Sequence, residues 1–270
     1  MFGTILGDII GSPYEFTGGK KTKEFPLFSE KSTYTDDTVM TLAVAEAFMD
    51  VKAEAAASED WILKRLTIQM RYYGKKYPDA GYGHKFCNWL KTRYPKPYNS
   101  FGNGSAMRVS SVAWLYNDLE TVRKMARLSA EVTHNHPEGI KGAEAVASAI
   151  YLARTGSTKT EIKTYIEDNF GYDLSRTCNE IRPSYKFEDS CQNSVPEAII
   201  AFLESKGFLD AIRLAVSLGG DTDTQAAIAG SIAEGYYGVP DELKAKCREY
   251  LPELLLQVLI RFENLPLNEV

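Results

Sequence analysis

The 270-residue sequence predicts an all-α fold, a compact orthogonal multi-helix bundle that forms a single domain over residues 1–270. Apolar residues recur at helical spacing, as in Leu42, Ala45 and Met49, whereas the alternation typical of β-strands is almost absent. Glycines and prolines interrupt these periods, and no low-complexity linker separates two halves of the chain. These interruptions predict roughly ten to thirteen helices around one core.

The first predicted helix, within residues 1–16, is apolar and contains a row of glycines. Gly3, Gly7 and Gly11 are four residues apart and therefore lie on one face. Each glycine inside a helix costs about 1 kcal/mol relative to alanine, so the row predicts a very close approach of another backbone. Asp8 in the same helix is a lone acid among apolar residues and requires a polar partner. The segment has no basic region or cleavage pattern, so we expect no signal peptide.

Further helices are predicted along the chain. The first follows an acidic cluster and covers residues 39–49, and apolar spacing indicates others over 62–73 and 143–150. A stretch rich in small residues, 224–235, predicts a second closely packed helix at the centre of the fold. The apolar run at 251–262 is typical of a core helix rather than a dimer face, so we expect a monomer.

Composition restricts the class of protein. The chain is 44% hydrophobic and 25% charged, which is ordinary for a globular protein. Its net charge of −5 argues against a nucleic-acid footprint but is compatible with a small basic pocket for a phosphate. No stretch of about 18 uncharged apolar residues is present, so we expect no contact with the membrane interior. The four cysteines show no CxxC spacing, which favours reduced thiols and a cytoplasmic protein.

Two short acidic clusters are the most informative feature of the sequence. Thr35-Asp36-Asp37-Thr38 and Asp221-Thr222-Asp223-Thr224 each precede a helix of small and apolar residues, with no Lys or Arg beside them. Ser, Thr and Asp are preferred helix N-caps, so capping alone accounts for either cluster. A cap needs only one such residue, however, and buried charges must be neutralised. Hydroxyl and carboxylate oxygens form a hard ligand set, which favours a shared site for Mg²⁺, Mn²⁺ or Ca²⁺.

Three other segments are candidates for binding or catalysis. The stretch Gly102-Asn103-Gly104-Ser105 offers bare N–H groups for a phosphate oxygen, although its spacing alone favours a plain loop with an N-cap serine. His134 is expected to hydrogen-bond a ligand or to cap a helix. Glu15, at the end of the first helix, is either a solvated glutamate or a carboxylate that orients water or a substrate hydroxyl.

The sequence resembles the ADP-ribosylglycohydrolases, the family of dinitrogenase reductase-activating glycohydrolase and the ADP-ribosyl-acceptor hydrolases. Five motifs occur in the family's order and span residues 3 to about 240. They are Gly-Asp-x-x-Gly-Ser-Pro-x-Glu-Phe at 7–16, Tyr-Thr-Asp-Asp-Thr at 34–38, Gly-Asn-Gly-Ser-Ala-Met-Arg at 102–108, Thr-His at 133–134, and Gly-Gly-Asp-Thr-Asp-Thr at 219–224. Each motif is modest alone, but the order and spacing together are specific.

The resemblance implies an all-α fold with a cleft that holds two Mg²⁺ or Mn²⁺ ions. The implied metal ligands come from the two acidic clusters and are Thr35, Asp36, Asp37, Asp221, Asp223 and Thr224. Asp223 would bridge both ions. Glu15 matches a loop glutamate of the family, and it or an aspartate such as Asp36 or Asp37 would activate water or protonate the leaving group.

The resemblance also implies where the ligand lies. Gly102, Asn103, Gly104 and Ser105 would hold the diphosphate of ADP-ribose, and His134 would contact the ligand in the same cleft. An aromatic residue, Phe101 or Tyr236, would stack on the adenine. The implied partner is an ADP-ribosylated protein or a small molecule that contains ADP-ribose.

The implied reaction is hydrolysis of the glycosidic bond between ADP-ribose and its acceptor. Arginine-linked ADP-ribose is the first expectation because the compact chain resembles microbial members, and serine-linked ADP-ribose or O-acetyl-ADP-ribose remains an alternative. A non-catalytic ADP-ribose binder is a further alternative. The segment between Glu15 and Thr35 departs from the family pattern because it is short and rich in lysine, which places the acceptor preference in question. Its lysines are Lys20, Lys21, Lys23 and Lys31.

Overall fold

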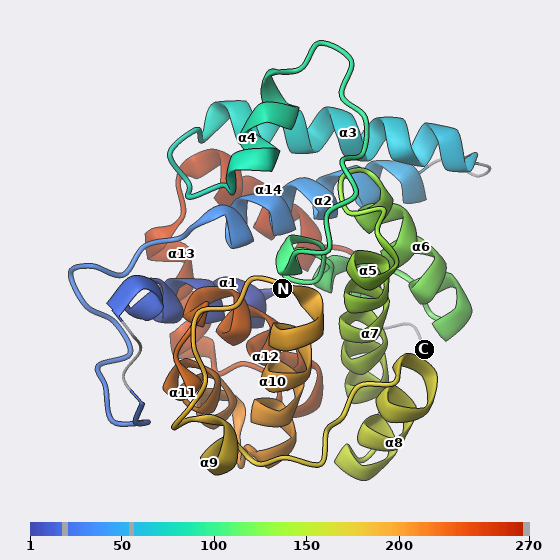
Figure 1. The fold of residues 1–270 in the computed structure, drawn as a ribbon. Helices are drawn as coiled ribbons and strands as arrows, with labels where there is room; N and C mark the ends of the chain where they lie inside the picture. Colours follow the sequence, from blue (N-terminus) through green and yellow to red (C-terminus); the bar gives the residue numbers. More distant parts are fainter. Residues whose placement is uncertain (18–20, 54–56, 267–270) are drawn as a thin grey trace.

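The computed structural model describes residues 1–17, 21–53 and 57–266, and these residues form an all-α bundle without β-strands (Figure 1). The α-helices are α1 (Phe2–Gly11), α2 (Asp36–Lys52), α3 (Glu59–Lys76), α4 (His84–Lys91), α5 (Ser110–Leu115), α6 (Leu119–Glu131), α7 (Pro137–Arg154), α8 (Lys159–Phe170), α9 (Cys178–Ile181), α10 (Cys191–Glu204), α11 (Phe208–Leu218), α12 (Thr222–Tyr237), α13 (Asp241–Tyr250) and α14 (Glu253–Glu263). Two 3₁₀-helices, η1 (Ser12–Thr17) and η2 (Asn103–Ser105), complete the described part.

The predicted all-α class is confirmed. Among the described residues the number of α-helices, fourteen, exceeds the expected ten to thirteen. The difference comes from short helices, since α5 has 6 residues and α9 has 4. Helices of this length contain too few turns to show an apolar period in the sequence.

Helices α1 and α12 pack antiparallel with almost no side chains between them, near the centre of the bundle (Figure 1). A Cβ atom at Gly3 would lie 2.1 Å from the carbonyl oxygen of Gly230, and one at Gly7 would lie 2.1 Å from that of Ala226. A Cβ atom at Gly11 would lie 2.5 Å from the Cα of Asp223. The close approach predicted from the glycine row is therefore confirmed, and the small-residue helix α12 is its partner.

Helix α12 also packs against α7, α10 and α11, while α2 packs against α3, α5 and α14. The antiparallel arrangement of α1 and α12 places the C-terminal end of α1 beside the N-terminal end of α12. The hydroxyl of Thr222 donates to the carbonyl oxygen of Gly11 at 2.9 Å and fixes this junction. The start of α2 is joined to the same region because Asp8 in α1 accepts hydrogen bonds from its first turn. Three helix ends thus meet at one place.

The expected core helix near the C-terminus is confirmed. Helix α14 buries Leu255, Val258, Leu259 and Phe262, so the apolar run at 251–262 is a core helix, although α14 itself begins at Glu253. All four cysteines are free. Among the described residues, no helix combines the length and apolar character needed to cross a membrane.

We expect Gly7→Ala to lower the free energy of unfolding by about 3 kcal/mol or more, because the added methyl would overlap the backbone of α12. Chemical denaturation followed by circular dichroism measures the change. Gly207→Ala is the matched control, since a Cβ at Gly207 meets no atom within 4 Å, and should cost at most about 1 kcal/mol. Equal losses in both variants would contradict the assigned role of the α1–α12 contact.

Candidate active site

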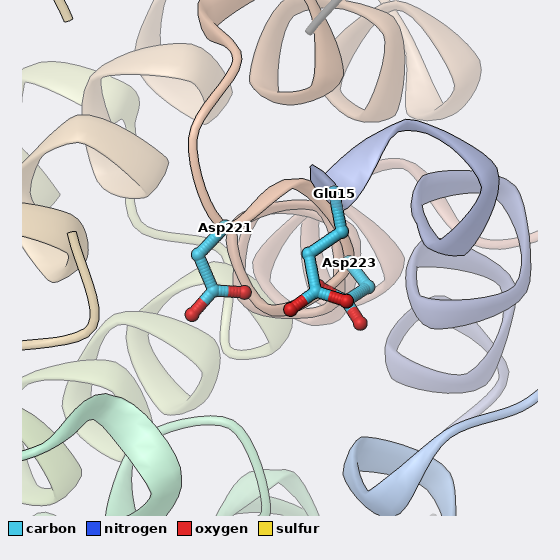
Figure 2. A group of neighbouring side chains, drawn as sticks. All are labelled: Glu15, Asp221 and Asp223. Atoms are coloured by element: carbon cyan, nitrogen blue, oxygen red, sulfur yellow. The ribbon is translucent and has the colours of Figure 1, made fainter. Parts of the chain in front are cut away.

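Carboxylates from distant parts of the sequence meet where α1, α2 and α12 converge. Glu15 in η1 and Asp221 and Asp223 at the start of α12 have carboxylate oxygens within 4.8 Å of one another. Figure 2 shows the three side chains pointing toward the same space. Gly219 and Gly220 both have positive φ, 77° and 80°, which allows the sharp turn from α11 into α12 that presents Asp221.

Asp8 holds the first acidic cluster in position. Its buried carboxylate accepts from the backbone N–H and hydroxyl of Thr35 at 2.9 and 2.8 Å. It also accepts from the N–H and hydroxyl of Thr38 at 3.0 and 2.5 Å. Thr35 in turn caps α2 by accepting from the N–H of Asp37 at 3.3 Å. Capping and a role in the site therefore coexist in this cluster, and Asp8 has the partners that its burial requires.

The carboxylates are buried without a basic side chain to neutralise them. One oxygen of Asp37, Oδ2, accepts from the hydroxyl of Thr224 at 3.1 Å. The other, Oδ1, is buried and accepts no hydrogen bond from any described residue. Asp221 accepts from the amide of Asn103 at 2.7 Å. No ion pair within the described residues includes these aspartates. An all-oxygen donor set with a buried acceptor left over fits a hard divalent cation.

The acids also raise one another's pKa. Burial, followed by the charges of Asp221 and Asp36, raises the pKa of Glu15 from an ordinary 4.5 to about 8. Burial and the charge of Asp8 raise the pKa of Asp36 to about 7. The pKa values of Asp37 and Asp223 are raised well above their ordinary 3.8, first by burial and then by neighbouring aspartates. Near pH 7 several of these acids would therefore hold a proton, and they can all be ionised together only when a cation is bound among them.

A cavity of about 440 Å³ opens from this cluster. The predicted residues that line it come from both acidic clusters, the glycine loop and the His134 segment, and are Glu15, Thr35, Asp36, Asp37, Gly102, Asn103, Gly104, His134, Asp221, Asp223 and Thr224. Ser105 is not among them, because its hydroxyl is buried and donates to the carbonyl oxygen of Gly139 at 2.7 Å. Phe101 also lines the cavity and is 45% exposed.

The glycine loop is held by the segment that precedes α10. The N–H of Asn103 donates to the carbonyl oxygen of Asp189 at 2.7 Å, and the N–H of Cys191 donates to that of Phe101 at 2.9 Å. A Cβ atom at Gly104 would lie 3.1 Å from Nε2 of His134, so glycine keeps the space between loop and ring open. The loop thus presents bare backbone to the cavity.

His134 and Arg108 form the buried wall beside this loop. Arg108 donates to the carbonyl oxygen of Ser129 and to the hydroxyl of Thr133, both at 2.9 Å. The same hydroxyl lies 2.7 Å from Nδ1 of His134. Burial and the charges of Arg108 and Lys85 hold the pKa of His134 well below 6.5, so its ring is neutral at pH 7. The helix cap in this segment is His136, which accepts from the N–H of Glu138.

Other predicted residues lie away from the cavity. Tyr236 packs against Phe202 and Tyr237 near the far end of α12, which excludes it from stacking on a ligand in the cavity. Lys21 donates to the carbonyl oxygens of Tyr185 and Leu218 at 2.7 and 2.5 Å.

The other lysines between Glu15 and Thr35 also differ in their contacts. Lys23 pairs with Asp210 at 2.7 Å, and Lys31 is exposed. Lys20 lies outside the described residues. Lys21 and Lys23 are thus tied to α11 or its neighbours and do not line the cavity.

The comparisons with known proteins agree with this geometry. A model of the ADP-ribosylglycohydrolase family matches residues 1–266, nearly the whole sequence. The chain belongs to the ADP-ribosylglycohydrolase family. The resemblance inferred from the five motifs is confirmed, and membership assigns the chain to a family of hydrolytic enzymes.

Relatives include ADP-ribosylhydrolase ARH3 of Homo sapiens, which is 29% identical over 334 residues and aligned over 93% of this chain and 88% of its own. ARH3 of Gallus gallus is 28% identical over the same shares of both chains. ADP-ribosylarginine hydrolase Tri1 of Pseudomonas putida is 26% identical, over 88% of this chain and 70% of its own. A solved structure titled "ADP-ribosylglycohydrolase-related protein complex" shares the fold, with a TM-score of 0.67, 22% identity and coverage of 96% and 95%.

Several residues of the family member's cavity carried no signal in the sequence. Asp189 and Phe187 line it through a segment without a motif, which reaches the cavity because its backbone pairs with the glycine loop. His84 is exposed and also lines the cavity, beside Lys85 at the start of α4. These residues reach the cavity through tertiary contacts, which leave no pattern in the neighbouring sequence.

The raised pKa values predict how stability depends on pH in EDTA. The folded state binds protons at these acids more tightly than the unfolded chain, so their contribution is complete below about pH 4. It is lost as pH rises through the folded pKa values of about 7 for Asp36 and about 8 for Glu15. We expect the free energy of unfolding in EDTA to fall between pH 5 and pH 8, and Asp37→Asn to raise it at pH 8 by about 1 kcal/mol.

Asp50→Asn is the control for this measurement, with the opposite sign. Partial burial raises the pKa of Asp50, but hydrogen bonds from Arg65 and Arg261 lower it overall. Its neutralisation should therefore destabilise the protein at pH 8. A loss of stability in Asp37→Asn comparable to that in Asp50→Asn would contradict the repulsion described for the cluster.

Proposed function

We propose that this family member is a metal-dependent hydrolase that cleaves the glycosidic bond between ADP-ribose and an acceptor side chain and releases ADP-ribose. The observation that carries the proposal is the unpartnered, buried Oδ1 of Asp37 within an all-oxygen cluster that opens into a cavity lined by a glycine loop. The acids of this cluster form no ion pair with a described basic side chain, which favours bound cations, and the cavity beside them can admit a ligand that contains phosphate.

The two acidic clusters would supply the ligands for two Mg²⁺ or Mn²⁺ ions. The proposed ligands are Thr35, Asp36, Asp37, Asp221, Asp223 and Thr224. Asp8 supports this role for Thr35, because it fixes the hydroxyl proton and leaves an oxygen lone pair directed elsewhere. Histidine and cysteine are absent from the set, which favours magnesium or manganese over zinc.

The bound cations would supply Lewis-acid chemistry at the ribose hydroxyls and lower the pKa of a water molecule. The chain's own residues would orient the bond and move the proton. Glu15 lies among the acids and is half-buried, so its protonation state depends on charges that change when ligands bind. We assign to it transfer of a proton to the leaving group or from the attacking water, while Asp36 and Asp37 position the reacting ribose.

The glycine loop would hold the diphosphate beside Gly102, Asn103 and Gly104, where the missing side chains of the two glycines let a ligand approach the backbone. The N–H groups of Gly102 and Asn103 already donate to Ser100 and Asp189. Neutral His134 would contact the ligand as a hydrogen-bonding group without adding charge. The exposed ring of Phe101 at the cavity edge suits stacking on adenine. Ser105 would act indirectly, since its hydroxyl supports the loop from behind.

The acceptor linkage is the finer part of the proposal. Arginine-linked ADP-ribose is the first substrate to test, and one relative, at 26% identity, carries this linkage in its name. The names of the ARH3 relatives, at 28% and 29% identity, specify no linkage. Serine-linked ADP-ribose and O-acetyl-ADP-ribose are therefore kept as alternative substrates.

The test is ADP-ribose release from arginine- and serine-ADP-ribosylated peptides and from O-acetyl-ADP-ribose, with Mg²⁺, with Mn²⁺ and with EDTA. Cation-dependent release from one substrate supports the proposal and identifies the linkage. Binding of ADP-ribose by calorimetry without release from any substrate would identify a non-catalytic binder. Release of phosphate from ADP-ribose or nucleotides would instead indicate a phosphoesterase.

We expect Asp36→Asn and Asp223→Asn to abolish turnover while the fold remains intact, because each removes a proposed ligand. Thermal unfolding with and without Mn²⁺ provides a readout independent of activity. The wild-type protein should gain stability with Mn²⁺, and both variants should lose most of that gain. A variant that stays active after removal of all divalent cations would refute the metal assignment.

We expect Glu15→Gln to lower kcat by about 10²–10⁴-fold, the range typical of a lost proton-transfer group, with a small change in ADP-ribose affinity. Steady-state kinetics and calorimetry separate the two effects. Asp189→Asn is the matched control, since it also removes one acid from the cavity lining. Parallel losses of turnover and affinity would reassign Glu15 to binding.

A further inference from the structure

The charge of this chain is distributed very unevenly. Residues 71–96 contain seven of the 31 Lys and Arg residues but only one of the 36 Asp and Glu residues. The rest of the chain therefore holds 24 basic and 35 acidic residues. A short segment with a net positive charge thus belongs to a chain that is otherwise strongly acidic. This segment covers the C-terminal half of α3, α4 and the loop after it (Figure 1).

The fold gathers this charge on one surface. A Cβ atom at Gly74 of α3 would lie 2.7 Å from the side chain of Leu90, so the C-terminal ends of α3 and α4 lie together. Arg71 donates to the carbonyl oxygens of Leu90 and Thr92, the latter at 2.7 Å, and ties the loop to α3. Six exposed cations follow from this arrangement, and we refer to them as the α4 surface. They are Lys75, Lys76, Lys85, Lys91, Arg93 and Lys96.

The cations of the α4 surface are available to a partner. Within the described residues, none of the six forms an ion pair, and the one acid of the segment is the exposed Asp79. Tyr94 lies between Arg93 and Lys96 and is 74% exposed, with the guanidinium of Arg93 5.3 Å from its ring centre. Exposed tyrosine and arginine side chains are typical of the residues that dominate binding at protein interfaces.

The α4 surface is continuous with the cavity. Lys85 belongs to both, and Phe86 of α4 and the N-cap residue Gly83 also line the cavity. A macromolecule whose modified side chain entered the cavity would therefore extend over α4. We propose that the α4 surface binds acidic residues that flank the ADP-ribosylated side chain of an acceptor polypeptide, and so selects acceptors by sequence. This inference rests on the proposed hydrolase function.

Charge favours a short acidic polypeptide over a nucleic acid. Surface charges act over about 8 Å at physiological ionic strength, so a short acidic stretch meets mainly the α4 surface. A long polyanion would extend beyond it over a surface that is acidic overall, since the chain has a net charge of −5 despite this segment. Tyr94 would add an apolar contact for a neighbouring side chain of the acceptor.

The test compares two ADP-ribosylated peptides with the same modified side chain, one flanked by Asp and Glu residues and one by Asn and Gln. The variant Lys91→Gln/Arg93→Gln/Lys96→Gln removes three charges outside the cavity. The control Lys206→Gln/Lys244→Gln/Lys246→Gln also removes three charges, those of the exposed Lys206 just before α11 and of the half-buried Lys244 and Lys246 in α13. We expect the wild-type protein to favour the acidic peptide by about tenfold in kcat/KM at low salt, mainly through KM.

The preference should disappear in the α4 variant, remain in the control and weaken as salt rises, while the neutral peptide is cleaved equally by all three proteins. Absence of the preference in the wild-type protein, or its loss in the control, would overturn the proposal. Stronger inhibition by a single-stranded oligonucleotide than by the unmodified acidic peptide, lost in the α4 variant, would assign the surface to nucleic acid instead. If no peptide is cleaved, anisotropy of the unmodified acidic peptide still tests the surface, and only the hydrolase function fails.

Discussion

The site depends on the direct backbone contact between α1 and α12. Because Gly3, Gly7 and Gly11 allow this contact, η1 leaves α1 beside the first turn of α12, and Glu15 reaches Asp221 and Asp223. A contact through ordinary side chains would separate helix axes by 8–10 Å and move these carboxylates apart. The glycines lower the intrinsic stability of α1, and burial of the whole helix in the core offsets this cost. The geometry of the site is therefore a property of core packing.

The same packing brings several acids together, at a cost in electrostatic free energy. Desolvation and mutual repulsion raise the pKa of Glu15, Asp36, Asp37 and Asp223, and Arg108 is the one basic side chain beside them that is fully buried. Arg108 donates to Ser129 and Thr133 and lies close enough to Asp36 to affect its pKa, but it forms no ion pair with the described acids. A protein selected for stability alone would place apolar residues here. The repulsion among the acids is understandable if bound cations complete the site. In that case the protein has a lower free energy of unfolding without cations in exchange for the ability to bind them.

Much of the fold and of the site could be predicted from the sequence, for identifiable reasons. The glycine row and the paired acidic clusters are local patterns with a physical meaning, so the close helix contact and the presence of both clusters at one cavity were predictable. The direction of a side chain is not a local pattern. Ser105 faces Gly139 and Tyr236 lies at the far end of α12, although both had been linked to the ligand. Asp189 enters the cavity through backbone pairing with a distant loop, and no pattern in the sequence encodes that pairing.

The distribution of charge also bears on how a ligand could enter. The inner end of the cavity is lined by Glu15 and four aspartates, and ADP-ribose carries a negatively charged diphosphate. Without cations, those acids that are ionised would repel this ligand, and the glycine loop offers only partial positive charge from its N–H groups. The α4 surface lies at the outer edge through Lys85, so an anionic substrate would first meet positive potential and then the acidic centre. Under the proposed function, productive entry of the diphosphate therefore requires that the acids be neutralised beforehand, which makes cation binding a condition for substrate binding as well as for chemistry.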